Sequence, residues 1–137
     1  MNKRDTSRIG DISEMEIAVA LMRSGRTVLR PLSSASRYDL LIDNGGGTYT
    51  RVQCKTGVLR QGAIVFRLYR VSGHDTRRIP YLDEIDAYGV YCPAVGRCYL
   101  VPESAIAGRT DMACLRLEPA RNGQVRHLNL AANYEIR

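Results

Sequence analysis

The sequence predicts an α+β fold in which one N-terminal helix packs on a mixed β-sheet and a second β-hairpin follows. Two observations predict it. Apolar residues recur at helical spacing over residues 9–24, and short alternating segments pair into two hairpins, at 38–55 and 87–102, around turns rich in glycine or proline. The chain has 137 residues, of which 45% are hydrophobic. This length and composition are typical of one globular domain, so we expect a single domain over residues 1–137.

The remaining elements follow in order along the chain. A polar arm at residues 3–8 precedes the helix, and Gly25 is placed to end the helix as a left-handed cap. Residues 63–69 alternate and predict a half-buried strand with Ile64, Phe66 and Leu68 on its inner side. Weaker patterns predict a strand at 27–32, a helical turn at 103–107, a strand at 115–118 and a short helix at 128–134.

The hairpin at 38–55 determines which polar side chains share a face. A five-residue loop at 44–48 sets the register so that Asp39 lies opposite Gln53, whereas a four-residue loop would place them on opposite faces. We favour the first register because it gathers the apolar side chains on one face. Asp39, Gln53 and Lys55 then form the inner part of the polar face. Carboxylate and amide oxygens beside an ammonium are typical of a hard-metal site next to a cation.

Positive charge is concentrated in the middle of the chain. The net charge is +6, and residues 51–78 contain seven basic residues and one acid. Such a stretch attracts phosphate and favours a nucleic-acid partner, although a solvated basic face is the alternative. Eighteen of the 20 basic residues are arginine, so a lysine within this chain is a candidate for a special task. The candidate DNA-binding residues are Lys3, Arg4, Arg8, Arg37, Arg51, Arg60, Arg67, Arg70, Arg77 and Arg78.

The apolar segments and the cysteines limit the cellular setting. The longest aliphatic stretch, at 17–22, is too short to cross a bilayer, and the start of the chain is polar, so we expect a cytoplasmic protein without membrane contact. The four cysteines are too few and too scattered for a disulfide framework and are expected to be small buried hydrophobes. A metal site between Cys92 and Cys98 across the second hairpin is the less favoured alternative.

Three short motifs together resemble the PD-(D/E)XK nuclease superfamily. They are Gly10-Asp11-Ile12-Ser13-Glu14 at the opening of the predicted helix, Tyr38-Asp39-Leu40-Leu41-Ile42, and Val52-Gln53-Cys54-Lys55-Thr56. The Q-x-K form is similar to the branch that includes an intron-encoded homing endonuclease and Holliday-junction-resolvase-like proteins. The resemblance implies a restriction-endonuclease-like core. The sequence departs from the usual pattern at Tyr38, where relatives have proline, and at Gln53, where most have an acid.

The resemblance also implies a catalytic set of Glu14, Asp39, Gln53 and Lys55. Asp39 would be the central ligand of Mg²⁺, with Mn²⁺ as the alternative ion. Gln53 would add its side-chain carbonyl, and Glu14 would bind directly or through water. Lys55 would position and help deprotonate the attacking water. Taken singly, Glu14 also fits a first-turn acid favoured by the helix dipole, and Glu16 is a second candidate for the helix acid.

These inferences predict a metal-dependent endonuclease that cleaves double-stranded or branched DNA. Because one such site cuts one strand, we expect at least a homodimer, and the resemblance to the homing-endonuclease branch also allows a homotetramer. The first alternative is a catalytically inactive DNA-binding module on the same fold, for which Gln53 is the signature. A second alternative, a protein-interaction domain, predicts no salt-dependent binding to DNA.

Overall fold

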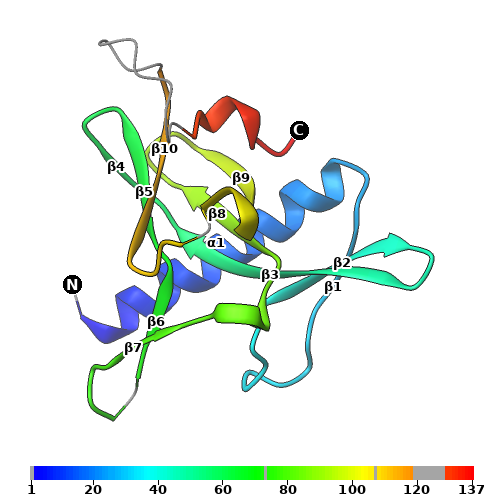
Figure 1. Cartoon of the computed structure of the whole chain (residues 1–137), viewed down its shortest axis with the longest axis horizontal. Helices are drawn as coiled ribbons and strands as arrows, with labels where there is room; N and C mark the ends of the chain where they lie inside the picture. Colours follow the sequence, from blue (N-terminus) through cyan, green and yellow to red (C-terminus); the bar gives the residue numbers. More distant parts are fainter. Residues whose placement is uncertain (1, 73, 107, 119–128) are drawn as a thin grey trace.

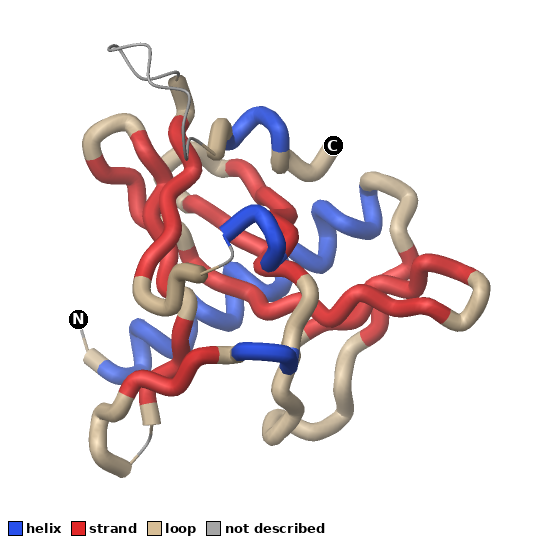
Figure 2. Tube along the Cα trace, viewed as in Figure 1, coloured by secondary structure: helices blue, strands red, loops and turns tan. Residues whose placement is uncertain are grey.

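Helix α1 (Lys3–Arg23) covers one face of a five-stranded sheet, and a second, three-stranded sheet covers the other face. This arrangement is seen in a computed structural model that describes residues 2–72, 74–106, 108–118 and 129–137. Figure 1 shows α1 running diagonally across the larger sheet, and Figure 2 shows that strands form most of the other regular structure. The α+β fold with one N-terminal helix is therefore as predicted.

The larger sheet is mixed, as predicted, because β3 and β8 are parallel and its other pairs are antiparallel. Its strands, in spatial order, are β1 (Thr27–Leu29), β2 (Leu40–Gly45), β3 (Thr48–Thr56), β8 (Ala87–Cys92) and β9 (Arg97–Pro102). The three-stranded sheet contains β10 (Met112–Arg116), β5 (Ala63–Arg67) and β4 (Val58–Arg60). A separate hairpin joins β6 (Tyr69–Val71) to β7 (Arg78–Pro80), and single turns of 3-10 helix lie at Leu82–Glu84, Glu103–Ile106 and Ala131–Asn133.

Helix α1 begins earlier than its apolar pattern indicates. The side chain of Asn2 accepts a hydrogen bond from the backbone N–H of Asp5 at 3.0 Å and caps the helix at Lys3. The predicted polar arm at 3–8 is therefore wrong: these residues form the first turns of α1. Glu14 consequently lies in the middle of the helix, so an interaction with the N-terminal helix dipole does not account for it. Gly25, with φ +91°, ends the helix as predicted.

The register of the β2–β3 hairpin is the predicted one. Leu40 pairs with Val52 and Ile42 with Thr50, which is the predicted register, and Asp39 lies in the bend just before the paired residues. The loop is shorter than predicted, because the strands extend to a two-residue turn at 46–47 and a bulge after Asp43 absorbs the extra residue. The bulge leaves the pairing on the site side of the hairpin unchanged.

Several other predictions are confirmed or corrected. The hairpin at 87–102 is confirmed, but Cys92 and Cys98 belong to core clusters on opposite faces of the sheet, which removes the alternative of a shared metal site. Cys114 is exposed rather than buried. The strand predicted at 63–69 is divided into β5 and β6. The last strand occupies 112–116 instead of 115–118, and the predicted helix at 128–134, whose first residue lies outside the described residues, is only a 3-10 turn.

The residues that the structure describes contain no helix with both the length and the hydropathy needed for a bilayer crossing.

The contact between α1 and the sheet depends on a close approach at Gly89. A Cβ atom at this position would lie 2.7 Å from Cγ2 of Ile17 and 3.2 Å from Cγ1 of Val52, and both of these side chains are fully buried. Glycine at position 89 therefore lets the helix pack directly on strands β3 and β8.

We expect Gly89→Ala to lower the free energy of unfolding by about 1–3 kcal/mol, because the added methyl group overpacks this contact. The matched control is Gly10→Ala, which meets no atom within 4 Å. Because Gly10 lies inside α1, the control should raise stability by up to about 1 kcal/mol. Urea unfolding measures both. Equal stability of Gly89→Ala and the unaltered protein would contradict this packing.

Candidate active site

Carboxylates from distant parts of the chain, those of Asp11, Glu14 and Asp39, line one cavity of about 340 Å³. Glu14 comes from the middle of α1, and Asp39 comes from the bend directly before β2. Arg30 lines the same cavity and forms an ion pair with Glu14 at 3.3 Å between Nη2 and Oε1. The fold therefore brings together two of the predicted metal ligands.

Asp39 is held at the point where β2 separates from β3. Its backbone N–H donates to the carbonyl of Val52 at 2.9 Å, and its Oδ2 accepts a hydrogen bond from the backbone N–H of Cys54 at 2.8 Å. This hydrogen bond satisfies the N–H of Cys54, which has no partner on β2 because that strand starts only at Leu40. The second carboxylate oxygen, Oδ1, accepts no hydrogen bond from the described residues. It remains free for a ligand.

Burial raises the pKa of both carboxyl groups. For Glu14, the negative charge of Asp39 raises the pKa further, while Arg30 opposes the shift. For Asp39, the N–H of Cys54 and the charge of Lys55 oppose the effect of burial without cancelling it. Two poorly hydrated carboxylates that repel each other are an environment that a bound cation stabilises.

Lys55 lies on the next strand, and its amino group forms two hydrogen bonds within the protein. The Nζ ammonium donates to the backbone carbonyl of Tyr69 at 2.9 Å and to the hydroxyl of Tyr81 at 2.7 Å, and it lies 4.7 Å from the centre of the Tyr81 ring. Burial lowers the pKa of Lys55 to about 8, although the nearby charge of Asp39 opposes this. A lysine tuned in this way exchanges a proton readily near neutral pH.

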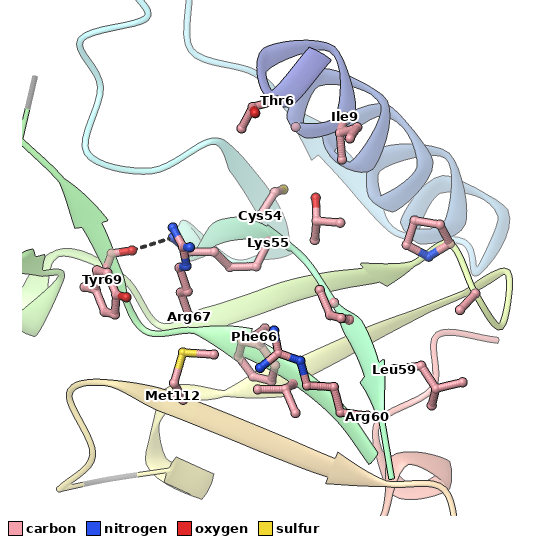
Figure 3. Close-up of a pocket in the computed structure, with 17 residues that line it drawn as sticks. Thr6, Ile9, Cys54, Lys55, Leu59, Arg60, Phe66, Arg67, Tyr69 and Met112 are labelled. Carbon is pink, nitrogen blue, oxygen red and sulfur yellow. Dashed lines mark hydrogen bonds between the residues drawn. The ribbon is translucent and has the colours of Figure 1, made fainter. Parts of the chain in front are cut away.

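Lys55 also lines a second, larger cavity of about 910 Å³. Figure 3 shows this cleft between Thr6 and Ile9 of α1 on one side and Arg67 and Met112 on the other. The cleft lies beside the smaller carboxylate cavity, since Cys54 lines the cleft while its N–H holds Asp39. A basic cleft thus adjoins an acidic pocket.

Gln53 is half-buried and lies on the face of β3 that also carries Lys55, opposite Tyr88 of β8. Its amide forms no hydrogen bond within the described part of the chain. The described residues also contain no group of three His, Cys, Asp or Glu side chains that could hold a metal ion. A third protein ligand beside Glu14 and Asp39 would therefore be an amide or backbone oxygen. The donor set is one of hard oxygens, which fits Mg²⁺ or Mn²⁺.

The structure divides the candidate DNA-binding residues into two groups. Three form ion pairs: Arg37 with Glu84 at 2.6 Å, Arg51 with Asp86 at 3.0 Å, and Arg77 with Asp75 at 3.7 Å. The other members are exposed and form no ion pair with the described residues, and they are Lys3, Arg4, Arg8, Arg60, Arg67, Arg70 and Arg78.

Arg67 and Arg78 lie over the same aromatic ring, with guanidinium carbons 5.9 Å and 4.7 Å from the centre of Tyr69. Tyr69 itself is buried, with 7% of its surface exposed. The Tyr69 ring therefore forms cation–π contacts with both guanidinium groups.

Arg30, Tyr69 and Tyr81 are site residues that the sequence analysis missed. No spacing indicates them, because each reaches the site through a contact across the fold. The sequence offers one indication of such residues. Lys55 is a rare lysine among arginines, so hydrogen-bond partners that position its amino group are to be expected.

Comparisons with known proteins agree with the predicted family and fold. A family model described as PD-(D/E)XK endonuclease matches residues 4–137. The fold is similar to the solved structure of a bacterial homing endonuclease, with a TM-score of 0.72 and 23% sequence identity over 95% of this chain and 88% of that chain. No curated protein matches the sequence.

We expect Asp39→Asn to raise the melting temperature at pH 7 by about 2 °C or more in metal-free buffer. The raised pKa of Asp39 means that ionisation destabilises the folded state, and the neutral amide avoids this loss. The gain should vanish below about pH 4, where the aspartate is protonated in both states. Asp43→Asn, at the turn of the hairpin, is the control and should give no gain. A lower melting temperature for Asp39→Asn at pH 7 would contradict the electrostatic account.

Proposed function

Because the chain belongs to the PD-(D/E)XK endonuclease family, we propose that it hydrolyses phosphodiester bonds in double-stranded or branched DNA with a divalent metal ion. The observation that carries the proposal is the meeting of Glu14 and Asp39 in one cavity, with Lys55 on the adjoining strand. Members of this family generally use divalent ions, and the oxygen donors of this site suit Mg²⁺, with Mn²⁺ as the alternative.

Asp39, Gln53 and Glu14 would hold the ion. When bound, it supplies polarisation of the scissile phosphate and a lower pKa for the attacking water. Asp39 has one oxygen fixed by Cys54 and presents the other, so its orientation is set before any ligand arrives. Gln53 contributes an oxygen without a charge, which predicts a weaker affinity for the ion than a third carboxylate would give.

Lys55 orients the attacking water and offsets the negative charge that develops on the phosphate. Its amino group is positioned by Tyr69 and Tyr81, and its pKa of about 8 keeps proton exchange accessible near neutral pH.

The cleft beside Lys55 is the proposed path of the DNA backbone. Arg60 and Arg67 line it, and Lys3, Arg4 and Arg8 belong to the first turns of α1, whose Thr6, Ile9 and Gly10 line its other side. We leave Arg37, Arg51 and Arg77 out of the proposed contact surface, since their charges are matched by acids. Arg60, Arg70 and Arg78 complete the surface.

We further propose a homodimer or homotetramer in the cytoplasm. Cutting both strands of a duplex requires two such sites. An exposed apolar stripe supports assembly: Ile12, Met15, Val19 and Met22 follow one another at helical spacing along α1 and are 38–61% exposed.

Incubation of supercoiled plasmid with the protein and Mg²⁺ or Mn²⁺ tests the activity. We expect nicking or linearisation that is abolished by Asp39→Asn and by Lys55→Met. Both variants should remain folded, because Lys55→Met replaces a buried charge with an apolar side chain of similar length. Mg²⁺ should raise the melting temperature of the unaltered protein but not that of Asp39→Asn.

The second candidate function is a DNA-binding module without catalysis, and the uncharged Gln53 favours it. The same experiment separates the two. Tight binding to the plasmid without metal-dependent cutting, by protein that melts cooperatively, would support the module and contradict the nuclease.

We expect the double variant Arg67→Gln/Arg78→Gln to weaken DNA binding in metal-free buffer. The slope of log affinity against log salt concentration should fall by about 2, since each contacted phosphate contributes roughly 0.9. Arg97→Gln is the control: it removes the same kind of charge, but Arg97, on β9, is already paired with Glu135. Fluorescence anisotropy with a labelled duplex measures both. Equal slopes for the double variant and the unaltered protein would exclude these two arginines from the DNA surface.

A further inference from the structure

Both partners of the Lys55 ammonium come from the base of a single hairpin. Tyr69, whose carbonyl accepts one hydrogen bond, is the first residue of β6 and pairs with Pro80, the last residue of β7. Tyr81, whose hydroxyl accepts the other, follows Pro80 directly. The base of the β6–β7 hairpin thus provides both hydrogen-bond acceptors of the amino group. These two residues are 14 and 26 positions from Lys55 in the sequence.

Tyr81 is itself held firmly. Its side chain is 4% exposed, and its ring packs edge-on against Tyr88 with 6.1 Å between the ring centres. Burial raises the pKa of Tyr81, so the hydroxyl keeps its proton and accepts from the ammonium through an oxygen lone pair. Nζ lies 4.7 Å from the centre of the Tyr81 ring, at its hydroxyl end. The Tyr81 hydroxyl therefore fixes the position of the Lys55 amino group.

We propose that Tyr81 is a positioning residue for the cleavage reaction, and that its hydroxyl, anchored at the base of the β6–β7 hairpin, holds the amino group of Lys55 in the orientation that catalysis requires. This inference rests on the proposed nuclease function. A lysine has four rotatable methylene links, and a productive geometry requires that this freedom be removed before the reaction. The same hairpin bears the exposed Arg70 and Arg78, so the segment that orients Lys55 is also part of the proposed DNA surface.

The test compares Tyr81→Phe with Tyr88→Phe. Each removes one hydroxyl group from a buried tyrosine of the same cluster and keeps its ring, but of these two hydroxyl groups that of Tyr81 accepts a hydrogen bond from Lys55 and that of Tyr88 does not. Single-turnover nicking of plasmid at increasing protein concentration separates the rate constant from the apparent affinity. We expect Tyr81→Phe to lower the rate constant about tenfold with unchanged affinity, and Tyr88→Phe to change neither.

Equal rates for Tyr81→Phe and the unaltered protein would overturn the proposal, and so would equal losses in both variants, since these indicate a general effect on the core. If the unaltered protein binds DNA but does not cut it, the nuclease function fails and the catalytic role of Tyr81 fails with it. A loss confined to Tyr81→Phe supports the proposal.

A second measurement does not depend on activity. The chain has two lysines, Lys3 and Lys55, so protein labelled with ¹³C at lysine Cε gives two side-chain signals. Because its amino group is hydrogen-bonded to the Tyr81 hydroxyl and lies 4.7 Å from the ring centre, the Lys55 signal should be displaced from that of the exposed Lys3. Tyr81→Phe should move the Lys55 signal alone, and Tyr88→Phe should leave both in place. Coincident signals in the unaltered protein, or no shift in Tyr81→Phe, would show that Tyr81 does not hold the lysine.

Discussion

The hydrogen bond from the backbone of Cys54 to the carboxylate of Asp39 is the contact on which the site depends. Strand β2 begins one residue after Asp39, so β3 continues without a partner on that side and exposes an unpaired N–H. Asp39 satisfies this donor with one oxygen and is thereby aimed into the cavity it shares with Glu14. The separation of β2 from β3 thus creates space for a ligand. It also fixes the orientation of Asp39, the residue proposed to bind that ligand.

Around this contact, the protein keeps charged groups where they are poorly hydrated. Burial raises the pKa of Glu14 and Asp39 and lowers that of Lys55, so each of the three groups is less stable in its charged form than it would be in water. Their destabilisation is offset by the packing of α1 and of the second sheet on the two faces of the large sheet. Sites that bind or transform a charged substrate commonly have this character.

The predictions that succeeded rest on local or periodic signals. The glycine-rich turn and the alternation of Leu40 and Ile42 with polar residues were enough to predict the β2–β3 register, even though a bulge replaced part of the predicted loop. The predictions that failed lacked such a signal. The start of α1 depends on the cap at Asn2 rather than on apolar spacing, and the short strands β4, β6 and β7 are stabilised by pairing across the fold.

By itself, the sequence determined the helix-on-sheet architecture, the register of β2 with β3 and the face shared by Gln53 and Lys55, because side-chain periodicity and turn chemistry act over a few residues. The tertiary structure alone decided that Glu14 reaches the cavity of Asp39, that Arg51 is neutralised by Asp86, and that Tyr81 holds Lys55. These contacts join segments 25 to 35 residues apart. Their existence depends on how the layers pack, and no local pattern in the chain encodes that packing.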